Sequence, residues 1–96
     1  MMVSVDERRP LRNPNVLLRQ EGKHGVAIHP KAKSAHRLNA TAVAIWVLCD
    51  GETTPTEMVT AVCELSKLPF EVVQEDVLRI LGEFEEADLI SWREPA

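Results

Sequence analysis

The sequence has few cysteines and no long apolar run. Cys49 and Cys63 are its only cysteines, and their spacing fits neither a CxxC motif nor a zinc site. We therefore expect two reduced, buried helix residues. No apolar run approaches the ~20 residues that a membrane-spanning helix needs, and residues 1–14 lack the apolar core of a signal peptide. These absences predict a cytoplasmic protein with no part in a membrane.

Sequence motifs for catalysis are also missing. There is no glycine-rich nucleotide loop, no GxSxG and no HExxH. His24, His29 and His36 form no ligand-like cluster, so we expect surface histidines and no metal site. The glutamates near the C-terminus lack the paired glutamate–histidine pattern of carboxylate metal sites. We therefore expect neither an enzyme nor a bound cofactor.

The net charge of −4 conceals an uneven distribution. Residues 1–37 carry eight Lys or Arg and three acids, whereas residues 38–96 carry three Lys or Arg and twelve acids. This pattern indicates a basic edge and an acidic helical layer that face different partners. Two solvated faces without partners would give the same charge distribution. With 96 residues, of which 45% are hydrophobic, the chain is long enough for one globular domain.

The first third of the chain predicts a small antiparallel sheet. Residues 1–12 are charged and contain Pro10, so we expect a flexible arm. Short apolar segments at residues 16–19, 26–29 and 34–38 predict three strands, because glycine or proline turns separate them. Such a sheet is marginal alone and needs helices to cover it.

An apolar helix is predicted over residues 40–49. Asn39 can cap its first turn, and Asp50–Gly51 can end it because glycine readily adopts a left-handed conformation. A helix without a polar face is buried on most sides, so we expect it to touch the sheet and both other helices. Trp46 is then expected in the core.

Two further helices complete the predicted domain. Thr54-Pro55-Thr56-Glu57 matches a capping box and starts the second helix, whose apolar stripe runs from Met58 to Leu65. The third helix spans residues 70–87. Its expected core stripe is Phe70, Val73, Val77, Ile80 and Phe84. Residues 89–92 predict a short terminal strand or tail, and residues 93–96 a C-terminal tail.

This order predicts an α+β, winged helix-turn-helix-like fold, with an N-terminal three-stranded antiparallel sheet followed by a three-helix bundle. Many such domains bind DNA with the third helix in the major groove. Here that helix carries seven acids from Glu71 to Asp88 and one cation, Arg79. Phosphate contacts require Lys and Arg, so the charge argues against nucleic acid.

A further pattern runs along most of the chain. It consists of Asn13-Pro14-Asn15-Val16, Leu18-Arg19, Leu38-Asn39-Ala40-Thr41, Ala44-Ile45-Trp46, Cys49-Asp50-Gly51, Thr53, Glu57-Met58, Asp76-Val77, Leu81 and Ala87-Asp88-Leu89-Ile90. In this pattern the sequence resembles the PqqD family, the pyrroloquinoline quinone biosynthesis protein D group. The resemblance covers roughly residues 10–92, and we place the domain at residues 13–92. The chain departs from the family pattern at residues 33–36, where apolar or aromatic residues are expected.

The resemblance implies a non-catalytic peptide chaperone, or RiPP recognition element. It would bind the leader segment of a ribosomally made precursor peptide and present it to a modifying enzyme, often a radical SAM maturase, in a pathway such as pyrroloquinoline quinone synthesis. The leader would add as a strand beside the third strand and lie against the third helix. The expected binding residues are Lys33, Ser34, Ala35, His36, Arg37 and Leu38 in the strand region and Val73, Val77, Leu78 and Leu81 in the helix.

These residues have physical roles in that arrangement. Residues 34–38 would offer an unpaired strand edge. Leu78 and Leu81 would form an apolar wall over Val73 or Val77, and Lys33, Arg37 and Arg79 would meet acidic leader residues. The plainer alternative makes Leu78 and Leu81 ordinary core residues.

Two other functions stay open. One is a winged-helix DNA-binding regulator; the other is a docking subunit of a maturase that uses the acidic helical face without binding peptide. A free strand edge also allows either a monomer or a homodimer.

Overall fold

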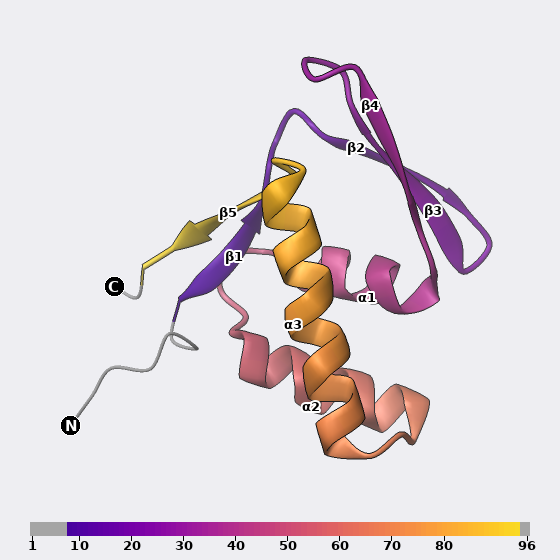
Figure 1. Ribbon diagram of the computed structural model, residues 1–96, viewed down its shortest axis with the longest axis vertical. Coiled ribbons are helices and arrows are strands. Elements are labelled where there is room, and N and C mark those ends of the chain that lie inside the picture. Colours follow the sequence, from indigo (N-terminus) through magenta and orange to yellow (C-terminus); the bar gives the residue numbers. More distant parts are fainter. Residues whose placement is uncertain (1–7, 95–96) are drawn as a thin grey trace.

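The computed structural model describes residues 8–94, which contain five strands and three helices (Figure 1). In chain order they are β1 (Arg9–Arg12), β2 (Leu17–Glu21), β3 (His24–His29), β4 (Ser34–Leu38), α1 (Ala40–Leu48), α2 (Pro55–Ser66), α3 (Phe70–Glu86) and β5 (Ile90–Arg93). β2, β3 and β4 form a three-stranded antiparallel sheet, and the helices follow it. The predicted α+β fold is therefore confirmed.

β1 and β5 form a second, two-stranded antiparallel sheet that the sequence did not predict. Pro10 is fully buried in it and lies opposite Trp92. The expected flexible arm of residues 1–12 is therefore wrong for residues 9–12, because these pair with a strand at the other end of the chain. Residues 1–7 lie outside the described residues.

Arg12 joins this two-stranded sheet to α1. Its Nη1 donates hydrogen bonds to the carbonyl oxygens of Trp46 at 3.2 Å and Val47 at 2.7 Å, near the end of the helix. A cation at a helix C-terminus also complements the negative end of the helix dipole.

The C-terminal tail was expected at residues 93–96. Arg93 still belongs to β5, so the tail begins after it.

The three-stranded sheet has an inner and an outer face, because successive side chains point to opposite sides. The register pairs Leu18 with Ala27 and Ala27 with His36, so these three lie on the inner face with the buried Leu38. The turns are tight. Gly22 and Lys33 have φ angles of 63° and 55°, in the left-handed region.

α1 lies at the centre of the domain, as predicted. The Asn39 side chain accepts a hydrogen bond from the Ala42 N–H at 2.9 Å, and the helix contacts β3, β4, α2 and α3. Trp46 is buried and meets Phe84 edge to face, with ring centroids 5.8 Å apart. Not every apolar side chain of the helix is buried, since Val47 is 56% exposed.

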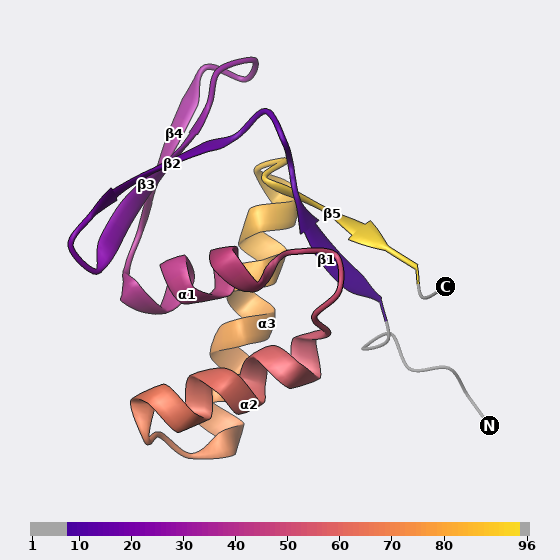
Figure 2. The same cartoon turned by 180° about the vertical axis from the view of Figure 1, so that it is seen from behind.

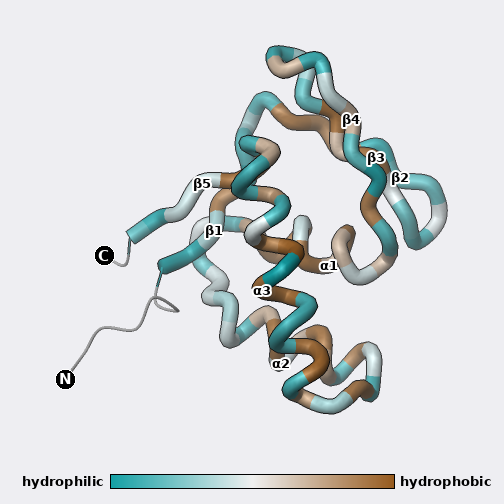
Figure 3. Tube along the Cα trace, viewed as in Figure 1, coloured by the Kyte–Doolittle hydropathy of each residue, from teal (hydrophilic) through white to brown (hydrophobic). Residues whose placement is uncertain are grey.

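α2 begins with the predicted capping box, in which Thr54 and Glu57 exchange hydrogen bonds. α3 then packs one face on the core through Val73, Val77, Ile80, Leu81 and Phe84. Leu65 and Phe70 were expected in the apolar stripes but are 77% and 48% exposed. They flank the α2–α3 turn, at the end of the helical layer farthest from the sheet (Figure 1). Figure 3 shows apolar segments where the helices meet and polar segments at the hairpin turns.

Candidate functional site

The clearest candidate site is the free edge of β4. Among the described residues, β4 pairs only with β3, so its other side carries main-chain N–H and C=O groups without a strand partner. Its bounds, Ser34–Leu38, are those of the predicted third strand. Figures 1 and 2, which are opposite views, place β4 and α3 on the same side of the molecule, with α1 behind them.

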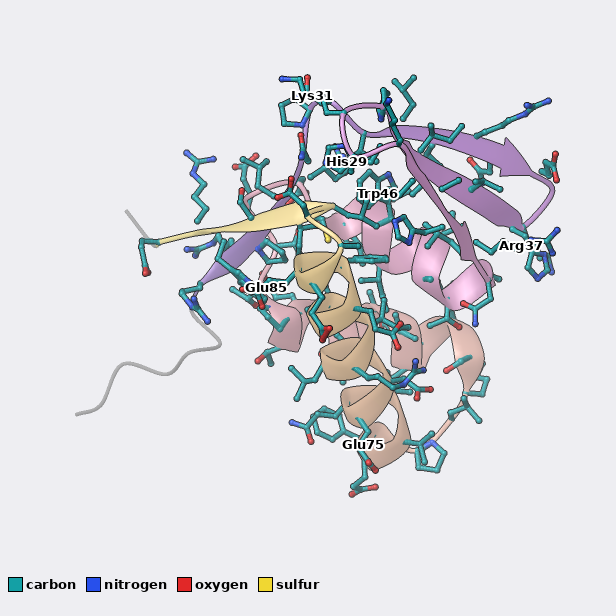
Figure 4. All side chains as sticks on the ribbon, turned by 45° about the horizontal axis from the view of Figure 1, so that its top comes forward. His29, Lys31, Arg37, Trp46, Glu75 and Glu85 are labelled. Atoms are coloured by element: carbon teal, nitrogen blue, oxygen red, sulfur yellow. The ribbon has the colours of Figure 1, made fainter. Side chains whose placement is uncertain are left out.

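The side chains of β4 alternate between two environments. Leu38 is buried under α1, and the half-buried His36 and Ser34 contact each other through Nε2 and Oγ at 3.1 Å. Ala35 and Arg37 are exposed on the outer face. Figure 4 shows Arg37 at the end of β4 pointing away from the helices.

The charge on the strand side of this edge is positive. No acid occurs between residues 22 and 49, whereas Lys31, Lys33 and Arg37 all lie there. Lys33 ends the β3–β4 turn, where its main-chain N–H donates to the Pro30 carbonyl at 3.1 Å. The strand side of the edge is therefore suited to a chain that carries negative charge.

Three of the predicted helix residues are core residues. Val73, Val77 and Leu81 are 1%, 0% and 1% exposed. They pack α3 against the rest of the core and offer no surface to a ligand. Leu81 is thus an ordinary core residue, which is the plainer of the two alternatives given above.

Leu78 is 50% exposed, but it lies on the wrong side of α3 for the expected wall. It lines a small depression of about 50 Å³ together with Pro55 and Val59 of α2. Figures 1 and 2 show the start of α2 and β4 on opposite sides of α3. The 3.6-residue period correctly marked Leu78 as next to the core stripe, but it gave no indication of which neighbour that side would meet.

The flank of α3 on the side of β4 is mostly charged, and Val72 is the exposed apolar residue on it. At 100° per residue, Asp76 and Glu83 lie roughly opposite Leu78 around the helix axis. Arg79 contacts both carboxylates, at 3.5 Å and 3.2 Å. The sequence predicted that Arg79 would meet an acidic ligand, but its guanidinium already has two carboxylate partners.

A buried histidine fixes the sheet to the end of α3. His29 of β3 is 4% exposed, so the expected surface position is wrong for this residue. Its Nδ1 accepts from the Ala32 N–H at 3.4 Å, which places the proton of the neutral ring on Nε2, where it is donated to the Asp88 carboxylate at 3.1 Å. The two residues are 59 positions apart, and no local pattern signals their contact.

One of the two cysteines, Cys49, has an unreactive thiol. Both thiols are free, as expected, although only Cys49 is fully buried. Burial raises the pKa of the Cys49 thiol to about 12, so it stays un-ionised at neutral pH and is a poor nucleophile.

Across residues 8–94 no three His, Cys, Asp or Glu side chains gather in a way that would hold a metal ion. Nor is any described helix long and apolar enough to cross a membrane.

Fold and site together define a small α+β domain with a free strand edge beside its last helix. The family described as "Coenzyme PQQ synthesis protein D (PqqD)" matches residues 16–90. The chain therefore belongs to the PqqD family.

A solved structure titled "TbiB1 in Complex with the TbiA(beta) Leader Peptide" is similar to the chain, with a TM-score of 0.75. The identity is 22%, and the match covers 84% of this chain and 94% of that chain. At this identity the similarity shows the fold. A comparison with curated protein sequences gives no match.

Proposed function

We propose that this protein is a non-catalytic peptide chaperone. It binds an extended leader segment of a ribosomally made precursor peptide as an additional strand beside β4. It then presents the peptide, in the cytoplasm where precursors are made, to a modifying enzyme such as a radical SAM maturase. Synthesis of pyrroloquinoline quinone is one pathway of this kind. Residues 13–92 form the peptide-binding domain in this proposal, with β1 packed against it.

The observation that carries the proposal is the unpaired edge of β4. An extended peptide can satisfy that edge with main-chain hydrogen bonds, which give affinity, while alternate side chains give specificity. Family membership and the leader peptide bound to the TbiB1 relative support this mode. Each apolar leader side chain that becomes buried contributes about 1.5–3 kcal/mol before the cost of ordering the peptide. We therefore expect moderate affinity.

The structure changes the role of α3 in this proposal. Val73, Val77 and Leu81 hold the helix in place from within the core. Inward-facing side chains of the peptide then meet His36 and the flank with Asp76. That flank is mostly charged, with Val72 as its exposed apolar residue, so the peptide needs fewer large apolar residues facing the helix than an apolar wall would require.

The test is a titration of isotope-labelled protein with the leader peptide encoded nearest its gene, followed by amide NMR and hydrogen exchange. We expect shifts and new protection at residues 34–38. β2 is the internal control, since it is the other edge of the same sheet. Equal changes at β2 and β4, or protection confined to α3, would rule out strand addition at β4.

Leu78→Asp is a matched control variant. Because Leu78 lies on the α2 side of α3, the charge should leave peptide affinity within about twofold of the native protein. If peptide affinity falls tenfold or more while circular dichroism shows an intact fold, Leu78 belongs to the binding site after all.

A docking subunit that binds the maturase directly is the second candidate. The acidic face of α3 favours it, because the helix carries six acids and one cation, Arg79, and two of those acids already pair with Arg79. Pull-down of purified maturase without any precursor peptide, and its loss in high salt, would support this function. DNA binding is disfavoured by the same acidic face.

A further inference from the structure

The outer face of the three-stranded sheet is left open by the described helices. α1 contacts β3 and β4 on the inner face, and the outer face carries exposed or half-buried side chains. The strand register arranges these in two rows that cross the sheet. One row is Leu17, Ile28 and Ala35; the other is Arg19, Val26 and Arg37.

Both rows end at the free edge of β4. A strand added there would lengthen each row by one residue, since directly opposite residues point to the same face. One added side chain would lie beside Ala35, and another would lie beside Arg37. These two positions are two residues apart on the added strand, whether it runs parallel or antiparallel to β4.

The chemistry of the rows differs. The row that ends at Ala35 is apolar, and its Leu17 is 61% exposed. The row that ends at Arg37 holds two cations around the half-buried Val26. Within the described part of the chain Arg37 has no hydrogen bond or ion pair, so it can accept an anionic partner.

A shallow depression of about 360 Å³ lies at the Arg37 end of the sheet. Arg37, His24, Val26 and Glu21 are among the residues that line it. Glu21 is the one acid there, but it is on β2, the strand farthest from the edge. Space and positive charge therefore occur together beside the position that an added strand would occupy.

We propose that this outer face selects the peptide by a short pattern: an Asp or Glu beside Arg37 and an aliphatic residue two positions away, beside Ala35. Strand addition brings the acid next to the cation, and the aliphatic residue extends the apolar row. The inference rests on the proposed function, because it requires a strand bound at β4. It adds a specificity-determining residue, Arg37, on the face away from α3.

The test is selection from a phage-displayed library of short random peptides on the native protein, Arg37→Glu and Arg19→Glu. The native protein should enrich peptides with an acid two residues from an aliphatic side chain. Arg37→Glu should enrich Lys or Arg at the acidic position and keep the aliphatic one. Arg19→Glu is the matched control: it reverses a charge in the same row, on the distant strand β2, and should select like the native protein.

Affinities of synthesised peptides then measure the contact. Replacing the acid by Ala should weaken binding to the native protein by up to about fivefold, the strength of an opposite-charge cross-strand pair. The same replacement should not weaken binding to Arg37→Glu. If peptides shift the β4 amides but both proteins select the same residue, the inference fails while the proposed function stands. If the native protein enriches no peptide that shifts those amides, both fail.

Discussion

Replacing Gly25 by Ala tests the contact between the sheet and α1, on which the position of β4 depends. Gly25 lies on β3, directly opposite Leu38 of β4. An added Cβ would lie 2.9 Å from Leu18 Cδ1, 3.3 Å from the Arg19 carbonyl oxygen and 3.4 Å from Val43 Cγ2. Glycine therefore permits the close approach of α1 to the sheet at this position.

The size of the effect follows from which neighbours can move. The Leu18 methyl is the end of a flexible side chain, whereas the Arg19 carbonyl and Val43 are held by the sheet and by α1. Overpacking of this kind costs about 1–3 kcal/mol, and replacing a glycine in a strand recovers about 0.5–1 kcal/mol. We expect a net loss of about 1–2 kcal/mol in the free energy of unfolding, and about 4–8 °C in Tm for each kcal/mol.

Gly82→Ala is the control, with the opposite sign. Gly82 lies in α3, and an added Cβ there would meet nothing within 4 Å. Alanine should stabilise the helix by about 0.5–1 kcal/mol. Urea unfolding of the two variants and the native protein measures both effects. Native or higher stability in Gly25→Ala would refute the packing argument, and a loss in Gly82→Ala would refute the assignment of an open helix surface.

Three further predictions concern stability. Thr54→Ala removes the capping box and should cost about 1 kcal/mol in urea unfolding. Leu81→Ala should cost about 2–5 kcal/mol because it leaves a core cavity, whereas Leu78→Ala, at a half-exposed position, should cost less than about 1 kcal/mol; equal losses would contradict the burial difference. The Glu52 N–H is the main cause of a lowered Asp50 pKa. The native protein should therefore have a higher Tm than Asp50→Asn, and this difference should be fully present above about pH 4. The difference should be lost as the pH falls through the lowered folded-state pKa. Measurements of Tm against pH for both proteins check this.

The local elements of the fold were predictable because their signals are local. The Asn39 cap and the capping box at Thr54 each depend on residues within a single turn. The third strand was found between a proline turn and a helix cap. The pairing of β1 with β5 was not predictable in this way. It joins residues 9–12 to residues 90–93, and neither segment alone specifies its partner.

The site was predictable only in part, for a related reason. The order of strands and helices identified residues 34–38 as a sheet edge. Apolar spacing also separated the buried face of α3 from its acidic face. It did not distinguish the two flanks of the helix, so Leu78 was assigned to the β4 side although it lies beside α2. Which flank meets which neighbour depends on how the helices cross, and sequence periodicity does not contain that information.

The Asn13–Val16 segment shows why part of the family pattern lies far from the edge that we propose binds peptide. The Asn13 main-chain N–H donates to the Leu89 carbonyl at 2.9 Å, and its side-chain amide donates to the Asp88 carbonyl at 3.0 Å. The segment thus ties the start of β2 to the end of α3, where His29 also bonds Asp88. The hydrogen bonds of Asn13 and of His29 both reach residues just beyond the C-terminus of α3. Asn13 belongs to the segment before β2, and His29 belongs to β3. They fix the sheet relative to the helix without using any main-chain group of β4. An edge that must stay free for a ligand has to be positioned by contacts elsewhere, and these contacts do so.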